Sequence, residues 1–452
     1  MSNITLGQAA LWCGGSVEEK YADVTFLGAN MDSRKILPGQ LFVALEGVRD
    51  GHDFIPMAME KGAAAVLCSR PQENIPAIVV EDVRIALGQI AACERQRIGM
   101  KVVGVTGSVG KSTTKEMIAC VLSAAYRVAK TPANHNNDIG MPMAVLSMPE
   151  DAEVAVLEMG MNHFGEISYL TNIAKPDVAV IINIGTMHIE HLGSQAGILK
   201  AKLEILEGLQ PGGQLMLYGD DSYLWSVRDS LSIKPVYFGC KNPENAIQAT
   251  NVNIGENVEF TACWDAGIMN ISIPVEGAHY VSDAMAAVSV GLAMGVRPEK
   301  IVDALAAFQN MEGRQEIFEA KGCTIIKDCY NAGPESMAAA LAVLGNRPGR
   351  KIAVLGDMLE LGVCTAAEHY KVGRIAAEKA DALLAYGPNS TRMVTGAITG
   401  GMPDRMTGAY TDRDALVTAL KRLVKPGDVL LFKGSHGMHM EIALEKFLKD
   451  ET

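Results

Sequence analysis

The chain has 452 residues, 48% of them hydrophobic and 20% charged, which is enough apolar material for two or three domains with buried sheets. Its formal net charge of −12 argues against a general electrostatic affinity for nucleic acid or for an anionic membrane. No apolar run approaches the roughly 18 residues of a membrane span and no basic-then-apolar leader is present, so we expect a soluble, cytoplasmic protein without membrane insertion.

The first segment, residues 1–82, alternates short apolar runs with turns. Runs of this length, separated by polar and glycine-containing segments, are typical of strands in a small α/β domain. The predicted elements are strands over residues 23–26, 40–45 and 63–67, a helix over 54–61 and a polar loop over 47–53.

A glycine-rich turn then joins an apolar strand, predicted over 102–105, to a helix predicted over 115–125. Such a turn offers backbone N–H groups and a positive helix end to phosphate, so the segment predicts ATP binding. Position 105 is valine where a full Walker A pattern has glycine, so this is a shorter form of that loop. The residues expected to bind nucleotide here are Thr106, Gly107, Ser108, Val109, Gly110, Lys111, Ser112 and Thr113.

The phosphate-binding turn lies in a larger central segment, residues 83–313. Its short apolar runs are separated by helical segments, which indicates a mostly parallel sheet with helices on both sides. The predicted elements are helices over 85–98 and 282–294, strands over 152–157, 178–184 and 214–218, and an antiparallel extension within 247–274.

The pattern of strand and helix pairs restarts at residues 314–452. A third domain of the doubly wound, Rossmann-like α/β type accounts for it. Its predicted elements include strands over 324–326, 351–357 and 429–433 and a helix over 336–344.

Two polar residues follow buried strands of the central segment. Glu158 ends one strand, and His188 comes shortly after the next. Parallel strands present their carboxyl ends at one edge of a sheet, so both side chains are expected near the phosphate-binding turn, as a candidate Mg²⁺ site. Lys200 and Lys202 follow on a predicted helix, where two such lysines are by themselves typical of a solvated face.

Together these motifs resemble the Mur ligases, ATP-dependent amide-forming enzymes of bacterial cell-wall synthesis, and the similarity covers essentially the whole chain. The resemblance implies that Lys111 steadies the β- and γ-phosphates of ATP and that Ser112 binds one Mg²⁺. It also implies that Glu158 and His188 hold a second Mg²⁺ together with a carbamate on Lys202. These are the implied catalytic and metal-binding residues.

The same resemblance places further residues around the nucleotide. Arg314 and Asp328 are implied to hold it as the third domain closes, and Asp283 is implied to lie near the adenine. Asp283 departs from the family pattern, in which many relatives have asparagine. Two other departures are Gly333 for the usual asparagine and His436 where arginine is common.

Within the family, two segments are similar to the member that adds D-alanyl-D-alanine to a UDP-N-acetylmuramoyl-tripeptide. These are residues 328–337, D-C-Y-N-A-G-P-E-S-M, and residues 355–362, L-G-D-M-L-E-L-G. The segment N-H-N-N-D-I-G at 134–140 points the same way, and 32–47 looks like the site for the uridine diphosphate end of the substrate. The implied substrate-binding residues are Ser33, Arg34, Asn134, Asn137, Asn331, Lys433 and His436.

Two alternatives stay open. One is another amide ligase of the superfamily, either the enzyme that adds the third residue of the peptide or a folylpolyglutamate synthetase-like protein. The other is an ATP-binding protein without ligase activity. We expect a monomer that binds no nucleic acid, and whether the third peptide residue is lysine or diaminopimelate is left open.

Overall fold

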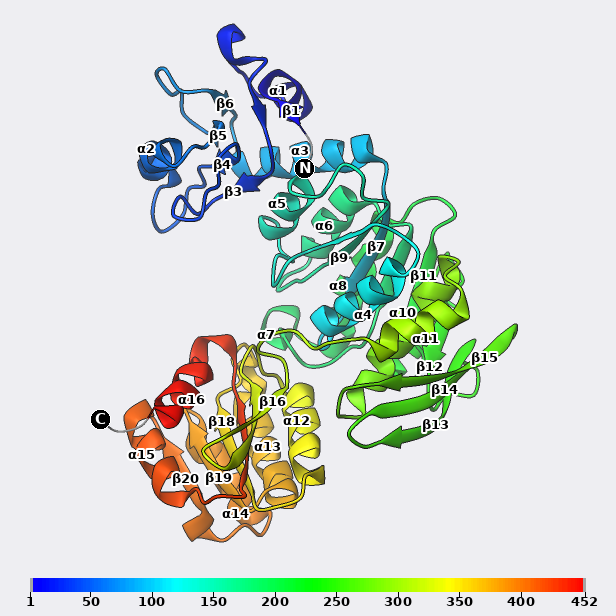
Figure 1. The fold of residues 1–452 in the computed structure, drawn as a ribbon, viewed down its shortest axis with the longest axis vertical. Helices are drawn as coiled ribbons and strands as arrows, with labels where there is room; N and C mark the ends of the chain where they lie inside the picture. Colours follow the sequence, from blue (N-terminus) through cyan, green and yellow to red (C-terminus); the bar gives the residue numbers. More distant parts are fainter. Residues whose placement is uncertain (1–2, 450–452) are drawn as a thin grey trace.

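The computed structural model describes residues 3–449. The molecule is elongated, with the N-terminal domain at one end, the C-terminal domain at the other and a large sheet between them (Figure 1). In this described part of the chain, four sheets of two, four, nine and six strands form the framework. Within the described residues, no helix is both long and apolar enough to cross a membrane.

The N-terminal domain contains a parallel four-stranded sheet and a separate antiparallel pair. The expected small α/β domain is therefore present, but the strand predicted over 23–26 is shorter and belongs to the separate pair. Part of the predicted loop over 47–53 is a 3-10 helix, Gly51–Phe54, which Asp50 caps by accepting from the His52 N–H. The elements are β1 (Ile4–Thr5), α1 (Leu6–Cys13), β2 (Thr25–Phe26), β3 (Ala29–Asn30), β4 (Leu41–Val43), α2 (Ile55–Glu60), β5 (Ala65–Cys68) and β6 (Ala77–Val79).

Helix α3 (Val83–Ile98) leads from this domain into the central one. Asp82 caps its first turn by accepting hydrogen bonds from the N–H groups of Arg84 and Ile85. Gly99 ends it in the left-handed conformation at φ 72°, which glycine adopts without steric cost.

The central sheet has nine strands in the order β15-β14-β13-β12-β11-β10-β7-β9-β8. Strands β7 to β13 pair in parallel, while β13, β14 and β15 form an antiparallel extension. This confirms the predicted mostly parallel sheet; β8 and β12 were not predicted. The strands are β7 (Lys101–Thr106), β8 (Val128–Lys130), β9 (Val154–Glu158), β10 (Val178–Ile181), β11 (Gln214–Tyr218), β12 (Val236–Gly239), β13 (Ile247–Ile254), β14 (Val258–Trp264) and β15 (Gly267–Ile273).

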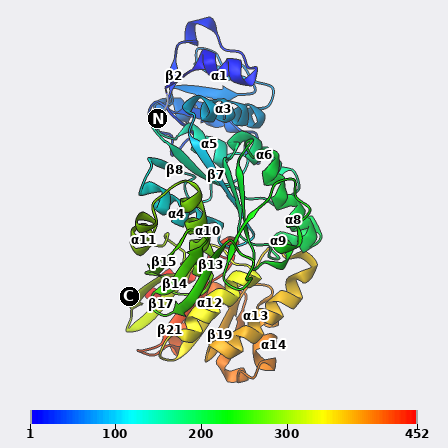
Figure 2. The same ribbon diagram turned by 90° about the vertical axis from the view of Figure 1, so that its right-hand side faces the viewer.

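Both faces of the parallel part of this sheet are buried, because successive side chains of its strands enter different cores. Val103 and Val105 of β7 pack with helices on one face, whereas Val102 packs with helices on the other. Figure 2 shows α4 and α11 on one side of the sheet and α6 and α8 on the other. The first group is α4 (Lys111–Ser123), α10 (His279–Ala293) and α11 (Pro298–Ala306); the second is α3, α5 (Gly140–Leu146), α6 (Glu166–Ala174) and α8 (Gln195–Leu203). Two short helices, α7 (Ile189–Leu192) and α9 (Ser222–Ser226), complete the domain.

The C-terminal domain is a six-stranded sheet in the order β16-β17-β21-β18-β19-β20, parallel except for β16. Helices α12, α13 and α14 share one core and α15 and α16 the other, so the predicted doubly wound architecture is confirmed. The elements are β16 (Glu316–Ala320), β17 (Cys323–Asp328), α12 (Pro334–Asn346), β18 (Lys351–Gly356), α13 (Thr365–Lys379), β19 (Ala382–Tyr386), α14 (Ser390–Thr399), β20 (Thr407–Tyr410), α15 (Arg413–Leu423), β21 (Val429–Lys433) and α16 (Met440–Leu448).

Candidate functional site

The glycine-rich turn lies between β7 and α4 at the carboxyl edge of the central sheet. Gly110 adopts a left-handed conformation at φ 84°, and α4 begins directly after it at Lys111. The prediction that this helix starts at Lys115 was wrong because the reversal at Gly110 lets the next residues enter the helix immediately. The first-turn N–H groups of α4 have no acceptor within the helix, so they and the positive helix end face the turn.

The side chain of Asn183, which follows β10, fastens this turn to the sheet. Its Oδ1 accepts from the N–H groups of Ser108 at 3.0 Å and Val109 at 2.9 Å, and its Nδ2 donates to the Val109 carbonyl at 2.9 Å. Gly107 lies close by, and a Cβ at this position would be 2.2 Å from Ile182 Cγ1. Our sequence reasoning missed Asn183, although its place at the end of a parallel strand is a signal that could have identified it.

Lys111 folds back over the turn, where its Nζ donates to the carbonyls of Gly107 at 2.9 Å and Ser108 at 3.2 Å. Burial lowers the pKa of Lys111, an effect that the carboxylate of Glu158 opposes and the guanidinium of Arg314 reinforces. Thr106 is fully buried and donates to the Met159 carbonyl at 2.9 Å, so its hydroxyl serves the junction between β7 and β9.

Glu158 is 2% exposed and has one oxygen without a hydrogen bond. Oε1 accepts from Asn136 Nδ2 at 2.8 Å, while the nearest cation, Lys115 Nζ, is 3.9 Å from Oε2. Among the residues described, none forms a hydrogen bond to Oε2. A buried carboxylate oxygen in this condition is energetically costly unless a cation reaches it, so its surroundings suit a metal ligand.

Lys202 lies on α8 and is 2% exposed, whereas its neighbour Lys200 is exposed and lies 5.7 Å from the Phe164 ring. The structure therefore separates two lysines that the sequence left equivalent. Burial, together with the charge of Lys111, lowers the pKa of Lys202 well below its usual range. Within residues 3–449, no hydrogen bond or ion pair to its Nζ is found, which leaves the amine available for chemistry.

One cavity, of about 310 Å³, brings together much of the predicted site. Its walls come from the turn, from β9 and from the C-terminal domain. Lys202 is not among the residues that line it, and residues 3–449 contain no group of three or more His, Cys, Asp or Glu side chains arranged to hold a metal. The predicted site residues that line it are Ser108, Val109, Gly110, Lys111, Ser112, Asn134, Asn137, Glu158, His188, Arg314, Asn331 and His436.

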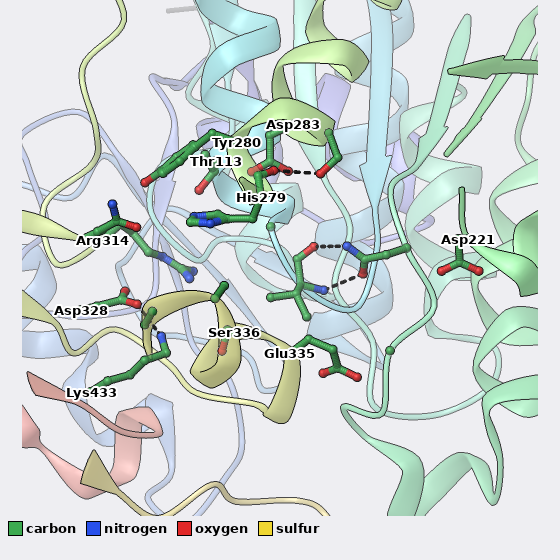
Figure 3. A pocket seen from close by; sticks show the side chains of 18 of the residues that line it. Thr113, Asp221, His279, Tyr280, Asp283, Arg314, Asp328, Glu335, Ser336 and Lys433 are labelled. Atoms are coloured by element: carbon green, nitrogen blue, oxygen red, sulfur yellow. Dashed lines mark hydrogen bonds and ion pairs between the residues drawn. The ribbon is translucent and has the colours of Figure 1, made fainter. Parts of the chain in front are cut away.

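A second cavity, of about 410 Å³, adjoins the other side of the turn. Figure 3 shows Arg314, Asp328 and Lys433 of the C-terminal domain facing His279 and Tyr280 of α10 across it. Apolar and aromatic groups form part of its wall, as expected of a site for a flat ring system next to phosphate. The predicted nucleotide residues that line it are Val109, Gly110, Thr113, Asp283, Arg314 and Asp328.

Asp283 lies on α10 against the first turn of α4. It is 4% exposed, and its Oδ1 accepts from the Thr114 hydroxyl at 2.9 Å. Burial raises the pKa of Asp283 to about 7, which the hydrogen bond from Thr114 and the charge of Arg314 only partly offset.

The C-terminal domain contributes cations to the cavity walls: Arg314 lines both cavities and Lys433 lines the second. Arg314 stacks over the ring of Tyr330 at 4.1 Å, and its Nη2 is 3.5 Å from the hydroxyl oxygen of Ser112. Lys433 is buried and donates to Asp328 Oδ2 at 2.6 Å and to the Asn331 carbonyl at 2.9 Å. The guanidinium of Arg314 thus lies within reach of the phosphate-binding turn, and the Lys433 ammonium lies at the wall of the second cavity.

Glu335 is a second contact that sequence reasoning missed. Its Oε1 accepts from the N–H of Thr186 at 2.9 Å and from the Thr186 hydroxyl at 3.1 Å, which joins α12 to the loop after β10. His188 in the same loop has its Nδ1 2.8 Å from Oε2 of Glu360, also a residue of the C-terminal domain. The segments 328–337 and 355–362 could have signalled both carboxylates.

The predicted substrate residues are not all in one place. Ser33 and Arg34 lie in the N-terminal domain and line neither cavity; Ser33 is 5% exposed, and Arg34 pairs with Asp32 at 2.9 Å. Asn137 lines the smaller cavity, but its Oδ1 accepts from the N–H of Gly140 at 2.7 Å at the start of α5. Asn137 therefore has a structural role there, whatever its Nδ2 binds. The ring of His436 lies 6.1 Å from that of Tyr330.

Comparison with known proteins agrees with this arrangement. Models of the Mur ligase family match in three stretches: the catalytic domain over residues 24–99, the middle domain over 105–291 and the glutamate ligase domain over 313–436. The UDP-N-acetylmuramoyl-tripeptide–D-alanyl-D-alanine ligase of Bacillus subtilis is 41% identical over 438 residues, which is 95% of this chain and 94% of that protein.

Solved structures give the same result. MurF from Acinetobacter baumannii superposes with a TM-score of 0.91 at 32% identity, with both chains covered completely. MurF ligase from Thermotoga maritima, solved in complex with ADP, superposes with a TM-score of 0.81 at 28% identity over 93% of this chain and 97% of that one. The fold, the phosphate-binding turn and these likenesses together establish that the chain belongs to the Mur ligase family.

Proposed function

We propose that this protein uses ATP to join D-alanyl-D-alanine to the terminal carboxylate of a UDP-N-acetylmuramoyl-tripeptide in peptidoglycan precursor synthesis. The relative from Bacillus subtilis carries this activity in its name. The observation that carries the proposal is the smaller cavity, in which the phosphate-binding turn and Glu158 face Asn331 and His436 of the C-terminal domain. A phosphoryl donor and an acceptor held by different domains could meet there.

The chemistry is carboxylate activation. The tripeptide carboxylate attacks the γ-phosphorus of ATP, the bond to the β–γ bridging oxygen breaks, and an acyl phosphate and ADP form. The amine of D-alanyl-D-alanine then attacks the acyl carbon, phosphate leaves, and the amine loses a proton. Negative charge gathers on oxygen in both steps, so positioning and electrostatic stabilisation supply most of the acceleration.

The nucleotide would lie across the turn, with its base in the larger cavity and its phosphates toward the smaller one. The Lys111 ammonium, which now donates to two carbonyls of the turn, would exchange them for β- and γ-phosphate oxygens. Arg314 lines both cavities and contacts Ser112, so it would hold the nucleotide from the C-terminal domain. Asp283 would lie near the base and Asp328 would orient Lys433.

Mg²⁺ would supply charge neutralisation at the phosphates. Ser112 would hold one ion, and Glu158, His188 and a carbamate on Lys202 the other. The residues fit this role because Glu158 has a buried oxygen without a hydrogen bond, and because Lys202 is a buried amine of lowered pKa, whose neutral form reacts with CO₂. A carbamate would give Mg²⁺ the anionic oxygen donor that it prefers.

The substrates would span the domains. Ser33 and Arg34 would bind the uridine diphosphate end. Asn134 and Asn137, with Asn331, Lys433 and His436, would meet the peptide and the dipeptide. We also propose that the domains divide at residues 1–82, 83–313 and 314–452, and that the protein acts as a cytoplasmic monomer.

An acceptor screen tests the proposal. ADP release from ATP and the UDP-linked tripeptide should depend on D-alanyl-D-alanine; release driven instead by a diamino acid or by glutamate would point to another ligase of the superfamily. Lys202→Ala should abolish phosphate release, whereas Lys200→Ala, the exposed neighbour on the same helix, should retain it. Unchanged phosphate release by the Lys202 variant would remove the carbamate from the mechanism.

A further inference from the structure

The segment at residues 185–190 of the central domain, a loop that runs into α7, is closely fitted by the C-terminal domain. A Cβ on Gly333 would lie 2.8 Å from Met187 Cγ, and a Cβ on Gly362 would lie 2.9 Å from Glu190 Cβ. Approaches this short are possible only because both positions of the C-terminal domain are glycine. The backbone of that domain therefore follows the loop on both sides of His188.

His188 and Glu360 meet at the centre of this contact, with Nδ1 and Oε2 2.8 Å apart. Both residues have left-handed backbones, at φ 63° and 62°, a conformation that is unfavourable for residues other than glycine. The Glu360 side chain is 51% exposed, so solvent screening leaves the contact, as an ion pair, little weight in stability. Two unfavourable backbone conformations are kept for an ion pair that stabilises the fold so little. This indicates that the pair serves to orient the two side chains.

The contact determines which nitrogen of His188 is available. The contact is not aligned as a hydrogen bond in this structure, but a carboxylate oxygen 2.8 Å from Nδ1 favours the tautomer with the proton on Nδ1. That tautomer leaves Nε2 with the free lone pair, as in metal sites where a carboxylate orients a ligating histidine. His188 lines the smaller cavity, together with Glu158 and Ser112. The orienting carboxylate, however, comes from the other domain. Glu158 differs in this respect, because its neighbours Asn136 and Lys115 belong to the central domain.

We propose that Glu360 is a positioning residue that holds His188 in the tautomer and orientation for metal binding, so that docking of the C-terminal domain completes the second metal site. The inference rests on the metal role proposed above for His188. It implies reciprocity: the second ion and the docked arrangement of the domains stabilise each other by the same free energy.

Metal binding tests this on the full-length protein with a non-hydrolysable ATP analogue and Mn²⁺, counted by electron paramagnetic resonance. Glu360→Ala should weaken the second Mn²⁺ equivalent about 10- to 100-fold and leave the first unchanged. Glu360→Gln keeps an acceptor oxygen and should stay within a few-fold of the unaltered protein. Glu368→Ala is the matched control, because Glu368 pairs with Lys371 within α13 of the same domain.

A second readout needs no metal. In ¹⁵N-histidine-labelled protein, the Nδ1–H signal of His188, assigned with His188→Gln, should disappear in Glu360→Ala and persist in Glu360→Gln. If Glu360 acted only as a charge in an ion pair between the domains, the Nδ1–H signal would disappear in both Glu360→Ala and Glu360→Gln. An unchanged tautomer and unchanged second-ion affinity in Glu360→Ala would overturn the inference while the ligase activity stood. Absence of a second Mn²⁺ site in the unaltered protein would overturn both this inference and the proposed metal role of His188.

Discussion

Two substitutions of Asn183 distinguish its effect on the stability of the phosphate-binding turn from the effect of a charge at this position on ATP binding. The side chain makes three hydrogen bonds to the turn, two with N–H groups and one with a carbonyl. Each contributes about 1 kcal/mol net, so Asn183→Ala should cost about 2–3 kcal/mol, the lower value applying where water replaces a partner. For a domain of this size that is a fall in Tm of about 5–10 °C in the transition of the central domain.

Asn183→Asp should behave differently. An ionised carboxylate still accepts from both N–H groups and loses only the donor to Val109, so stability should fall by about 1 kcal/mol. The added negative charge would lie near the phosphates; at roughly 6 Å and an effective dielectric constant of about 20, repulsion is about 3 kcal/mol. We therefore expect ATP affinity to fall roughly 100-fold in a variant that remains folded.

Calorimetric unfolding and equilibrium ATP binding, measured on the same samples, give the two quantities. Asn172→Asp is the matched control, since Asn172 lies exposed on α6 of the same domain. Its Nδ2 donates to the Ser168 carbonyl, and its Oδ1 accepts from Lys175 Nζ, an interaction that a carboxylate keeps. Asn172→Asp should leave both the unfolding temperature and the ATP affinity nearly unchanged. An Asn183→Asp variant that binds ATP as tightly as the unaltered protein would refute the assignment of this turn to phosphate.

Three further predictions concern the domain junction and the base site. The folded-state pKa of Asp283 is raised from 3.8 to about 7, so between these pH values the folded protein keeps a proton that the unfolded chain releases. The free energy of unfolding should therefore fall as pH rises through this window, by at most about 4 kcal/mol. Asp283→Asn should flatten this dependence in denaturant titrations at pH 5 and 8; the same pH dependence in the variant would contradict the assignment. Gly333→Ala would place a Cβ 2.8 Å from Met187 Cγ, which costs about 1–3 kcal/mol through overpacking. We expect kcat/KM to fall roughly tenfold in this variant and to recover when Met187→Ala is added; no recovery would disprove the steric cause. Asp328→Ala leaves the ammonium of the buried Lys433 with the Asn331 carbonyl as its remaining acceptor among the described residues. This variant should destabilise the C-terminal domain by about 3 kcal/mol in urea unfolding, and adding Lys433→Met should restore part of that stability. A single variant as stable as the unaltered protein would show that the ion pair contributes nothing to stability.

The sequence by itself identified the features that depend on neighbouring residues. The phosphate-binding turn was found because glycine, lysine and serine at fixed spacing follow an apolar strand, and both large sheets were predicted from short buried runs separated by helical segments. The strand at Gln214–Tyr218 has the predicted bounds. These signals are local, since dihedral preference and hydrophobic period act within a few residues.

Several short strands were not predicted, because what makes them strands is not local in the sequence. β3, β6, β8 and β12 have two to four residues each, too few to show a period, and they are strands because neighbouring strands pair with them. Strand β16 is longer but half-buried and antiparallel, at the edge of its sheet. Pairing partners that are distant along the chain supply the hydrogen bonds that define all five.

The tertiary structure alone decided the state of individual side chains in the site. Lys200 and Lys202 are equivalent by composition, and only the packing of α8 buries the second. Asn183 belongs to the turn although it lies 74 positions along the chain from Val109, and Glu360 reaches His188 from another domain. Burial, pKa and hydrogen-bond partner depend on groups brought together by folding, so no local pattern in the chain specifies them.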